Sequence, residues 1–466
     1  MQIKLKPGVK LFATQKSDLA LLCKHSRFCN FSEMGAGKTL PSAILSLGVV
    51  EDDLCDYSII VTPKIVVGDW YKTFTDQMDC DYKKDVLVYN APTVLRPFVE
   101  LKPVTIMSYD TYYADKVRWD KLVKKYRVML TFDEAHWIRN HESGRGALSA
   151  HLAKYAKRVY LLTGSPYPNG LRAAYSYLNI LEPDVHYVSH KHFILQHYVY
   201  SPSDRRKLIG YKNVEKITAL MSRLSVRHYK KEMLDLPPVT FTTRTVSWNR
   251  AQVEAYKEFQ SMAILETEKS WIEATTAATM AMRLHQIITN PKLLGLDCDS
   301  NKFQTIEEDL EAIDLSKNKV VIYAHYRGTI DRLLKRLKDY NPAAIYGKVS
   351  DSEGQKRKFL EDDSCRLMVA NAASAGIGVN FTVSSYFIFF EYAYDLDSYD
   401  QAVSRGNRPG QTAPLTIINY ALKGSMEIRK ILPRLVSKKE FSMYVLQDPD
   451  EFIEFINLDE EEALVA

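Results

Sequence analysis

The stretch that decides the fold is Ser32-Glu33-Met34-Gly35-Ala36-Gly37-Lys38-Thr39. Its two glycines allow the backbone to curl so that successive N–H groups face one anion. The helix expected after it adds its positive N-terminal end. Lys38 can reach the β- and γ-phosphates of a nucleotide, and the Thr39 hydroxyl can bind Mg²⁺. The strict pattern has glycine where this chain has Ser32, and a structural glycine turn is the alternative. The stretch therefore predicts a phosphate-binding loop.

Short apolar runs alternate with helical patterns around this loop. The runs at 58–61, 104–107, 128–132 and 159–162 are β-branched or aromatic and end in polar, glycine or proline turns. Strands that alternate with helices indicate a parallel sheet with ligands at its carboxyl edge. Similar runs return at 320–323, 367–370, 386–390 and 415–418. We predict an α/β fold with one lobe at 1–190, a mostly helical insert at 191–300 and a second lobe at 301–466. A possible strand at 239–247 lies in the insert segment, and one alternative is that it returns to the sheet of the first lobe.

Composition places the chain among ordinary globular proteins. Of its 466 residues, 46% are apolar and 26% are charged. No apolar run approaches the length of a membrane span, and the first residues lack the apolar core of a secretory signal. The six cysteines are scattered without a C-x-x-C pair. We therefore expect reduced thiols, no zinc site, no membrane association and a cytoplasmic location.

The net charge of +5 is unevenly distributed. Residues 448–466 contain eight acids and no lysine or arginine, whereas residues 191–238 contain ten basic residues against four acidic ones. The basic segment indicates either polyanion binding or an ordinary solvated helical surface, with similar weight for each. The acidic tail is expected either to bind a protein partner or only to increase solubility.

A second acidic signature, Asp133-Glu134-Ala135-His136, follows the apolar run at 128–132. Two adjacent carboxylates at the carboxyl end of a buried strand are costly unless they meet a cation. Asp133 would hold Mg²⁺ and Glu134 would polarise an attacking water. The alternative is a helix N-cap with an acidic first turn. The phosphate loop upstream in the same predicted lobe favours the magnesium interpretation.

Two arginines three residues apart, Arg405 and Arg408, lie in the segment 401–411. On a helix, that spacing would put both on one face. A guanidinium group suits a γ-phosphate because it stays charged and makes bidentate contacts. One lobe cannot hold both these arginines and Lys38, which precedes them by more than 360 residues. We therefore expect the second lobe to close over a nucleotide held by the first. The alternative is a solvated basic helix end.

In this order, the motifs resemble those of the superfamily 2 helicases and translocases, and within them the Swi/Snf-like branch. The resemblance spans roughly residues 10–425 and is carried by Gln15, the phosphate loop and the segments 133–140, 163–169, 227–237, 283–291, 376–380 and 401–411. It implies two RecA-like parallel-sheet lobes that hydrolyse ATP with Mg²⁺ and move along nucleic acid. The chain departs from the branch at 371–375, Asn-Ala-Ala-Ser-Ala, where a hydroxyl and a cation are usual.

The resemblance also implies roles for individual residues. ATP would be bound by Gln15, Gly35, Ala36, Gly37, Lys38, Thr39 and Gly378, and Mg²⁺ by Thr39 and Asp133. Catalysis would fall to Lys38, Asp133, Glu134, Arg405 and Arg408, with Arg408 as the arginine finger. Coupling of hydrolysis to lobe motion would involve His136, Thr163, Gly164, Ser165 and Gln401. The nucleic acid would be contacted by Thr62, Pro63, Lys64, Ser108, Tyr109 and Gly376.

The function expected from the motifs is an ATP-dependent DNA translocase or helicase that acts on forked or branched DNA. The specific expectation is a small phage-encoded branch-migration helicase in the bacterial cytosol, with no small-molecule substrate except ATP. The alternatives are an RNA helicase, a duplex translocase that displaces proteins, a non-catalytic binding module and a small-molecule kinase. Aromatic residues of the insert would stack on exposed bases or, more simply, form its small core; they are Phe193, Tyr198, Tyr200, Tyr211 and Tyr229.

Overall fold

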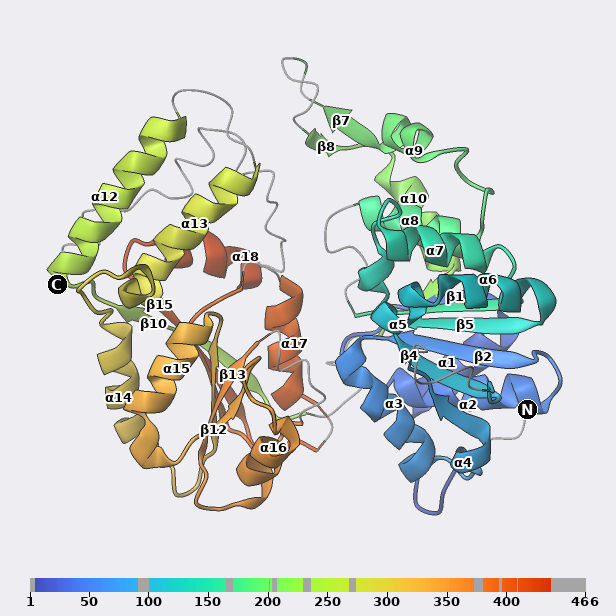
Figure 1. Ribbon diagram of the computed structural model, residues 1–466, viewed down its shortest axis with the longest axis horizontal. Helices are drawn as coiled ribbons and strands as arrows, with labels where there is room; N and C mark the ends of the chain where they lie inside the picture. The colour runs from blue at the N-terminus through green and yellow to red at the C-terminus, as the bar shows by residue number, and fades with distance from the viewer. Residues whose placement is uncertain are drawn as a thin grey trace. The chain divides into compact units, whose positions relative to one another are not determined.

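The computed structural model describes residues 5–90, 100–164, 171–200, 202, 208–228, 236–267, 274–372, 380–393, 396–408 and 410–436. The chain divides into two compact units, Met1–Leu234 and Asp235–Ala466. Each unit has its own sheet (Figure 1). Buried apolar residues form two core clusters in the first unit and one in the second among the described residues. No helix in the described part of the chain is long and apolar enough to span a bilayer.

The first unit is built on a seven-stranded sheet with the strand order β3-β4-β2-β5-β6-β1-β9. All of its strand pairs are parallel. The strands are β1 (Arg27–Asn30), β2 (Tyr57–Thr62), β3 (Val86–Val88), β4 (Val104–Ser108), β5 (Val128–Asp133), β6 (Arg158–Leu162) and β9 (Ser225–Val226). Ile59 and Val61 of β2 lie in one hydrophobic core, and Ile60 lies in another. Because alternate residues of a strand face opposite sides, the sheet is covered on both faces.

Helices of the first unit connect these strands, as a parallel sheet requires. They are α1 (Ala13–Lys24), α2 (Thr39–Glu51), α3 (Val67–Lys72), α4 (Tyr82–Asp85), α5 (Tyr109–Ala114), α6 (Lys116–Lys125), α7 (Gly144–Ala153), α8 (Arg172–Leu181), α9 (His190–His197) and α10 (Val214–Arg223). A short antiparallel hairpin, β7 (Tyr198–Tyr200) and β8 (Leu208–Tyr211), follows α9. In Figure 1, the hairpin extends from the helices rather than from the sheet.

The second unit has a six-stranded sheet with the order β10-β15-β14-β11-β13-β12. Its pairs are also all parallel. The strands are β10 (Val239–Val246), β11 (Val320–Ala324), β12 (Ala343–Ile345), β13 (Leu367–Asn371), β14 (Tyr386–Phe389) and β15 (Leu415–Leu422). The helices are α12 (Arg250–Thr267), α13 (Ala274–Thr289), α14 (Lys302–Ala312), α15 (Arg327–Arg336), α16 (Ser352–Glu361), α17 (Leu396–Gly406) and α18 (Leu432–Val436). Two parallel α/β units are the predicted fold, which is confirmed.

The segment expected to form one insert is divided between the two units. The hairpin, α10 and β9 belong to the first unit, and α12 and α13 belong to the second. The suggestion that residues 239–247 return to the first lobe is wrong, because β10 pairs along its whole length with β15. The strand that does return is β9, whose Ser225 pairs with Cys29 of β1. With two residues, β9 is too short to produce a periodic signal.

Candidate active site

The phosphate loop lies between the end of β1 and the start of α2, so it has the predicted position at the carboxyl edge of the first sheet. Gly35 and Gly37 have φ values of +82° and +79°, a region that residues with a side chain rarely adopt. The Lys38 ammonium donates to the carbonyl oxygens of Ser32 at 2.6 Å and Glu33 at 3.2 Å. The loop therefore wraps around its own lysine.

Ser32, which replaces the usual glycine, is fully buried and has a structural role. Its hydroxyl oxygen accepts a hydrogen bond from the backbone N–H of His228 at 3.1 Å. Its own N–H donates to the Asn30 side-chain oxygen at 3.0 Å. The hydroxyl thus joins the loop to the segment after β9, a contact that a glycine could not make.

Gln15 of α1 contacts the same loop. Its amide nitrogen donates to the Gly37 carbonyl at 3.0 Å, and its amide oxygen accepts from the Phe12 N–H at 2.9 Å. A Cβ atom at Gly37 would lie 2.5 Å from the Gln15 amide nitrogen, so this close approach requires glycine. Gln15 thus contacts the phosphate loop, and its contact with adenine stays a prediction.

Asp133 is the last residue of β5, and its buried carboxylate is held by three donors. One oxygen accepts from the Thr62 hydroxyl at 2.9 Å and from the Trp70 indole at 2.8 Å, and the other accepts from the Glu134 N–H at 3.0 Å. Burial and the neighbouring Glu134 carboxylate raise the pKa of Asp133 to about 6, against the effects of Trp70, Thr62 and Lys38. The carboxylate is fixed in one orientation, and the charge of Lys38 offsets the cost of burial only in part, a condition that a cation would relieve.

Glu134 has a left-handed backbone, with φ at +48°. Such a conformation costs on the order of 1–3 kcal/mol for a residue with a side chain, and it is concentrated at functional sites. The His136 ring nitrogen Nδ1 lies 3.3 Å from the Glu134 carboxylate, and both side chains are largely buried. The turn therefore orients Glu134 beside His136, as a water-polarising carboxylate would need.

A buried polar network, which the sequence did not reveal, packs against the phosphate loop. Asp18 of α1 accepts a hydrogen bond from the Asn30 side chain at 2.7 Å, and its other oxygen lies 2.8 Å from His228 Nε2. Asp18 and Asn30 are both buried. Because His228 is 210 residues from Asp18, no local spacing could indicate this pair. The network ties α1, β1 and the segment after β9 to the phosphate loop.

Two of the residues predicted to couple hydrolysis to motion, Thr163 and Gly164, follow β6 and lie against the loop. Thr163 is buried, and its N–H donates to the Asn30 carbonyl at 3.1 Å. A Cβ atom at Gly164 would lie 3.0 Å from the Met34 backbone nitrogen, which is tighter than an ordinary contact. Glycine thus allows this turn to touch the phosphate loop, while Ser165 lies outside the described residues.

Of the first-unit residues predicted to contact nucleic acid, several have side chains engaged within the protein. Thr62 donates to Asp133, the Ser108 hydroxyl caps α5 by accepting the Thr111 N–H, and the Tyr109 hydroxyl donates to the Asp133 carbonyl at 2.8 Å. Pro63 is buried, whereas Lys64 is exposed. Lys64 therefore keeps the clearest potential for a phosphate contact, and the role of all five residues stays a prediction.

Three of the predicted second-unit residues, Gln401, Arg405 and Arg408, lie along and after α17. Gln401 and Arg405 are in this helix, but α17 ends at Gly406, so Arg408 is beyond it. The inference that both arginines share one helix face is therefore wrong. The chain turns after the helix end, where the Arg408 N–H donates to the Gly406 carbonyl at 3.1 Å. Gly376 and Gly378 lie outside the described residues.

The groups gathered at the edge of the first sheet match the chemistry of a magnesium–nucleotide complex. Burial lowers the pKa of Lys38, and the Glu134 and Asp133 carboxylates oppose that shift. A lysine at a glycine loop, a hydroxyl on the first residue of a 13-residue helix and a carboxylate at the end of β5, two strands from β1 in the same sheet, provide the expected set of donors and ligands. The fixed, poorly neutralised Asp133 carboxylate is the observation that fits a cation.

Comparison with known proteins gives two adjacent family matches. A model described as the SNF2-related domain matches residues 25–293, and the helicase conserved C-terminal domain matches residues 301–410. A DNA repair and recombination protein RAD54-like from Drosophila ananassae is 25% identical over 89% of this chain and 59% of its own length. A CHD3-type chromatin-remodeling factor CHR7 from Arabidopsis thaliana is 23% identical over 85% of this chain and 34% of its own length.

This chain thus spans between about a third and three-fifths of the length of these curated relatives. Among solved structures, a Sulfolobus solfataricus SWI2/SNF2 ATPase core in complex with dsDNA has 20% identity and a TM-score of 0.45, over 98% of this chain and 99% of that one. A further Sulfolobus solfataricus SWI2/SNF2 ATPase core domain has 19% identity and a TM-score of 0.44, over 98% of this chain and 96% of that one.

Proposed function

This chain belongs to the SNF2-related family of ATPases, and we propose that it couples ATP hydrolysis to movement along DNA and thereby remodels forked or branched DNA. The single observation that carries the proposal is the meeting of the phosphate loop with the Asp133–Glu134 turn at one edge of the first sheet. The Lys38 ammonium interacts electrostatically with both carboxylates there. Such a site is built for a charged phosphoryl group and its cation.

In the proposed reaction, Lys38 exchanges its carbonyl partners in the loop for phosphate oxygens of ATP. Thr39 and Asp133 would hold Mg²⁺, which neutralises charge on the transferring phosphoryl group. Glu134, oriented beside His136, polarises the attacking water. Gln15 would contact the adenine base while its amide donates a hydrogen bond to the Gly37 carbonyl. The hydrogen bonds from Thr62 and Trp70 lower the pKa of Asp133 and fix the orientation of its carboxylate.

The second unit is proposed to complete the reaction centre. Arg405 and Arg408 would stabilise the γ-phosphoryl charge when the lobes close, and the finger is assigned to Arg408. ATP would then favour the closed state and loss of phosphate would release it, because a ligand drives a conformational cycle only through different affinities for two states. Alternating closure moves the protein along a strand if each unit holds backbone phosphates.

The DNA structure is proposed to matter more than its sequence, since contacts to phosphates carry no sequence information. Lys64, exposed just after the end of β2, is suited to such a contact. The name of the Drosophila relatives, DNA repair and recombination protein, supports branched substrates. A second candidate is a duplex translocase that displaces proteins without strand separation. The chromatin-remodeling factor among the relatives favours it.

One set of assays tests the proposal and separates it from its alternatives. ATPase rates are measured with single-stranded, duplex, forked and four-way DNA and with matched RNA, and strand separation is followed on the same substrates. We expect the largest stimulation by forked or four-way DNA, together with loss of binding as salt rises. Equal stimulation by all duplexes without strand separation would favour the duplex translocase. Stimulation by RNA alone, or hydrolysis that no nucleic acid stimulates, would contradict the proposal.

A further inference from the structure

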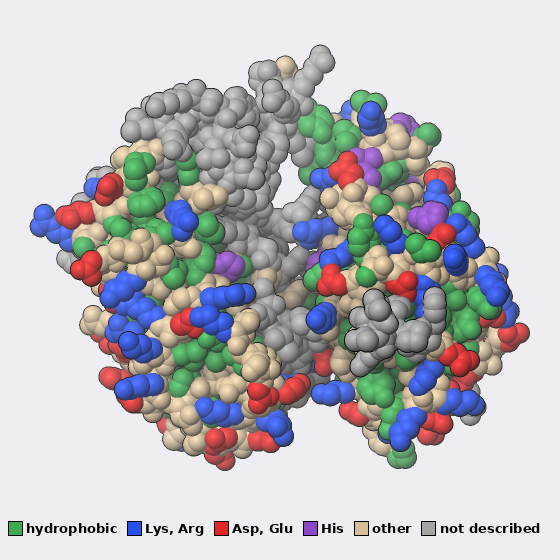
Figure 2. Space-filling model, viewed as in Figure 1, with side chains coloured by type: hydrophobic (Ala, Val, Ile, Leu, Met, Phe, Trp, Pro, Cys, Tyr) green, Lys and Arg blue, Asp and Glu red, His purple; other side chains and the backbone are tan. Residues whose placement is uncertain are grey.

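We propose that His141, Glu142 and His190 of the first unit bind a divalent transition-metal ion of the Zn²⁺ class, at a site distinct from the nucleotide site. His141 and Glu142 lie in the turn between Ile138 and α7, and His190 is the first residue of α9. One ligand atom from each residue lies within 4.8 Å of those of the other two. Histidine side chains gather on the face of the first unit over α8 and α9 (Figure 2).

The two histidine rings are close to each other and to the carboxylate. Their centroids are 3.9 Å apart with the planes inclined at 53°, and His141 Nε2 lies 3.9 Å from Glu142 Oε1. Zinc binds imidazole nitrogen and carboxylate oxygen at about 2.0–2.2 Å, so bound ligand atoms are about 3.3 Å apart. The three side chains therefore need to approach by roughly an ångström, which rotation about side-chain bonds supplies.

Two buried ring nitrogens in this cluster have no hydrogen-bond partner among the described residues. They are His141 Nδ1 and His190 Nε2. A buried polar atom without a partner costs on the order of 1–3 kcal/mol, and such atoms are rare in folded proteins. The Tyr175 ring packs against both histidine rings instead, and its centroid lies 4.9 Å from the centroid of each. A coordinated ion would give the unused nitrogen lone pairs a partner.

The protonation state of the rings suits a metal. Burial, together with the neighbouring His141 and Arg172, lowers the pKa of His190 to about 4. Burial also lowers the pKa of His141. A lowered pKa favours the neutral ring, which is the form that coordinates a cation. Two imidazoles and one carboxylate form a donor set typical of zinc and similar ions.

Arg172 provides the outer contact that metal-binding carboxylates usually have. Its guanidinium donates to Glu142 Oε2 at 2.5 Å, which leaves Oε1 on the side of His141. Hydrogen bonds from the second shell orient ligating carboxylates in this way. The positive charge of Arg172 would oppose that of an ion, and the Glu142 carboxylate, shared between them, would offset both charges.

The position of the site gives it a consequence for the whole unit. His141 is eight residues after Asp133, at the end of the turn that carries Glu134 and His136. His190 starts the helix that leads directly into the β7–β8 hairpin. An ion bound by both would tie the acidic turn of the nucleotide site to the base of the hairpin and stabilise α9 against local opening.

Cobalt is the probe for the test, because tetrahedral Co²⁺ absorbs visible light and competes for zinc sites. The full chain is stripped of metal with a chelator and titrated with Co²⁺, followed by displacement with Zn²⁺. We expect one equivalent of Co²⁺ with ligand-field bands and release of the colour by Zn²⁺. His141→Ala, His190→Ala and Glu142→Gln should each weaken Co²⁺ binding at least tenfold.

The matched control is His192→Ala, which removes a histidine from the same helix. The His192 ring is already paired with the Gln196 side chain at 2.8 Å, and its substitution should leave Co²⁺ affinity unchanged. His190→Gln serves as a conservative variant, with the thermal melt of each metal-free protein as a check on folding. Equal Co²⁺ affinity in the wild type and the His141→Ala/His190→Ala double variant would overturn the proposal. Failure of the wild type to saturate at millimolar Co²⁺ would do so too.

Discussion

The Thr62 hydroxyl donates a hydrogen bond of 2.9 Å to the Asp133 carboxylate. Thr62 ends β2 and Asp133 ends the adjacent β5, so the bond joins two neighbouring strand ends in the parallel sheet. Trp70 of α3 adds a second donor to the same oxygen at 2.8 Å. A residue that the motif resemblance assigns to DNA thus acts on the acidic motif. Through this contact, the predicted DNA site and the predicted ATP site share the Asp133 carboxylate.

The first prediction concerns the acid limb of the ATPase pH profile. Hydrogen bonds from Thr62 and Trp70 lower the pKa of Asp133, which burial and Glu134 raise to about 6. Thr62→Val or Trp70→Phe should raise that pKa further, by roughly one unit for a bond to a charged group. Since protonated Asp133 cannot bind Mg²⁺, the acid limb should move to higher pH. The Mg²⁺ concentration for half-maximal rate near pH 6 should rise about fivefold.

Thr62→Ser is the matched control for this experiment, because it keeps the hydroxyl and removes only a methyl group. Its pH profile should follow that of the wild type. Acid limbs that coincide in Thr62→Val, Trp70→Phe and the wild type would show that these donors do not set the protonation of Asp133.

The second prediction separates nucleotide binding from turnover. Lys38→Ala should abolish hydrolysis, because the loop loses the cation that faces the phosphates. Arg408→Ala should keep ATP binding and lose on the order of 10³-fold in turnover, as arginine fingers do. ATP affinity is measured by titration calorimetry and turnover by release of phosphate. Arg250→Ala, at an exposed arginine of the same unit, is the control. Turnover by Arg408→Ala at the wild-type rate would leave Arg405 as the only candidate finger.

Much of this site could be predicted from short stretches of sequence. The buried strands β2, β4 and β5 are continuous apolar runs, and the phosphate loop and the Asp133–Glu134 pair are local patterns. Sequence reasoning missed β1, because Arg27-Phe28-Cys29-Asn30 is short and polar at both ends. Yet Asn30 positions Ser32 by a hydrogen bond.

The contacts that could not be predicted join residues far apart in the chain. The Trp70 indole reaches Asp133 across 63 residues, and His228 reaches Asp18 across 210. Neither Trp70 nor His228 lies at a spacing that indicates its partner, because the packing of helices and connecting segments around the sheet brings these residues together. Arg408 was misplaced for a local reason: helical spacing was extended two residues beyond Gly406, where α17 ends.

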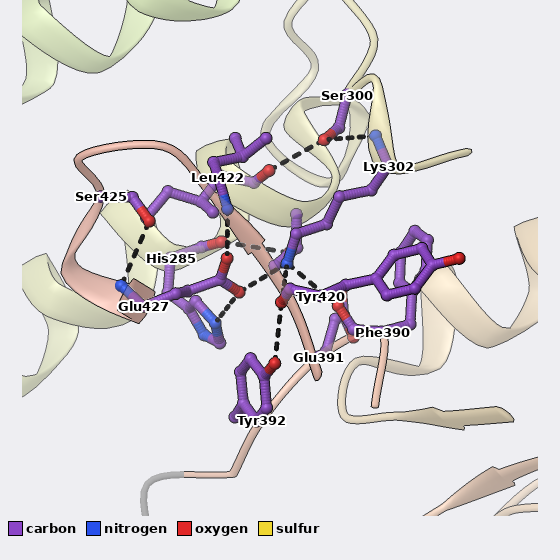
Figure 3. Close-up of polar contacts among 12 residues, drawn as sticks. His285, Ser300, Lys302, Phe390, Glu391, Tyr392, Tyr420, Leu422, Ser425 and Glu427 are labelled. Atoms are coloured by element: carbon purple, nitrogen blue, oxygen red, sulfur yellow. Dashed lines mark hydrogen bonds and ion pairs between the residues drawn. The ribbon is translucent and has the colours of Figure 1, made fainter. Parts of the chain in front are cut away.

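The third prediction concerns a buried ion pair in the second unit (Figure 3). The Lys302 ammonium lies 2.7 Å from Glu427 Oε1, and His285 Nε2 lies 3.2 Å from the same oxygen. All three side chains are fully buried. The carbonyls of Phe390 and Tyr420 accept the remaining protons of the ammonium. The network joins α13, α14 and the segment after β15.

Lys302→Met should destabilise the second unit by about 3–5 kcal/mol, since it leaves Glu427 as an uncompensated buried charge. The double variant Lys302→Met/Glu427→Leu should recover most of that loss, because both charges are then gone. Hydrogen exchange of the β11 and β15 amides measures the free energy of opening in this unit alone. A double variant less stable than Lys302→Met would contradict the ion-pair account.

The same pair sets a pH dependence. Burial raises the pKa of Glu427, but Lys302 and His285 lower it more, so the net shift is downward. A lowered carboxyl pKa contributes stability that is present above the unfolded pKa and is lost as the pH falls through the folded one. Glu427→Gln should therefore flatten the acid dependence of opening in β15, measured by exchange between about pH 5 and pH 3.

The fourth prediction concerns the aromatic residues of the hairpin. Phe193 is fully buried, and it packs with Tyr175 and Tyr187 at ring distances of 5.3 Å and 4.9 Å. Tyr200 and Tyr211 on the two hairpin strands are instead 37% and 39% exposed. The core interpretation therefore holds for Phe193, whereas these two tyrosines are partly exposed and contact the ring of Tyr198. Tyr229 lies outside the described residues.

The double variant Tyr200→Ala/Tyr211→Ala should lose about tenfold in the remodelling of forked or four-way DNA, because stacking on one base contributes roughly 1–3 kcal/mol. ATPase activity without DNA should be unchanged, since neither ring contacts the phosphate loop or the acidic turn. Tyr155→Ala is the control, because Tyr155 is 47% exposed in the same unit but lies outside the hairpin. Replacing residues 199–210 by a two-residue turn extends the test and should abolish remodelling. If either variant remodels four-way DNA at the wild-type rate, the hairpin does not act on the branch point. The contacts to DNA must then come from other groups, such as Lys64.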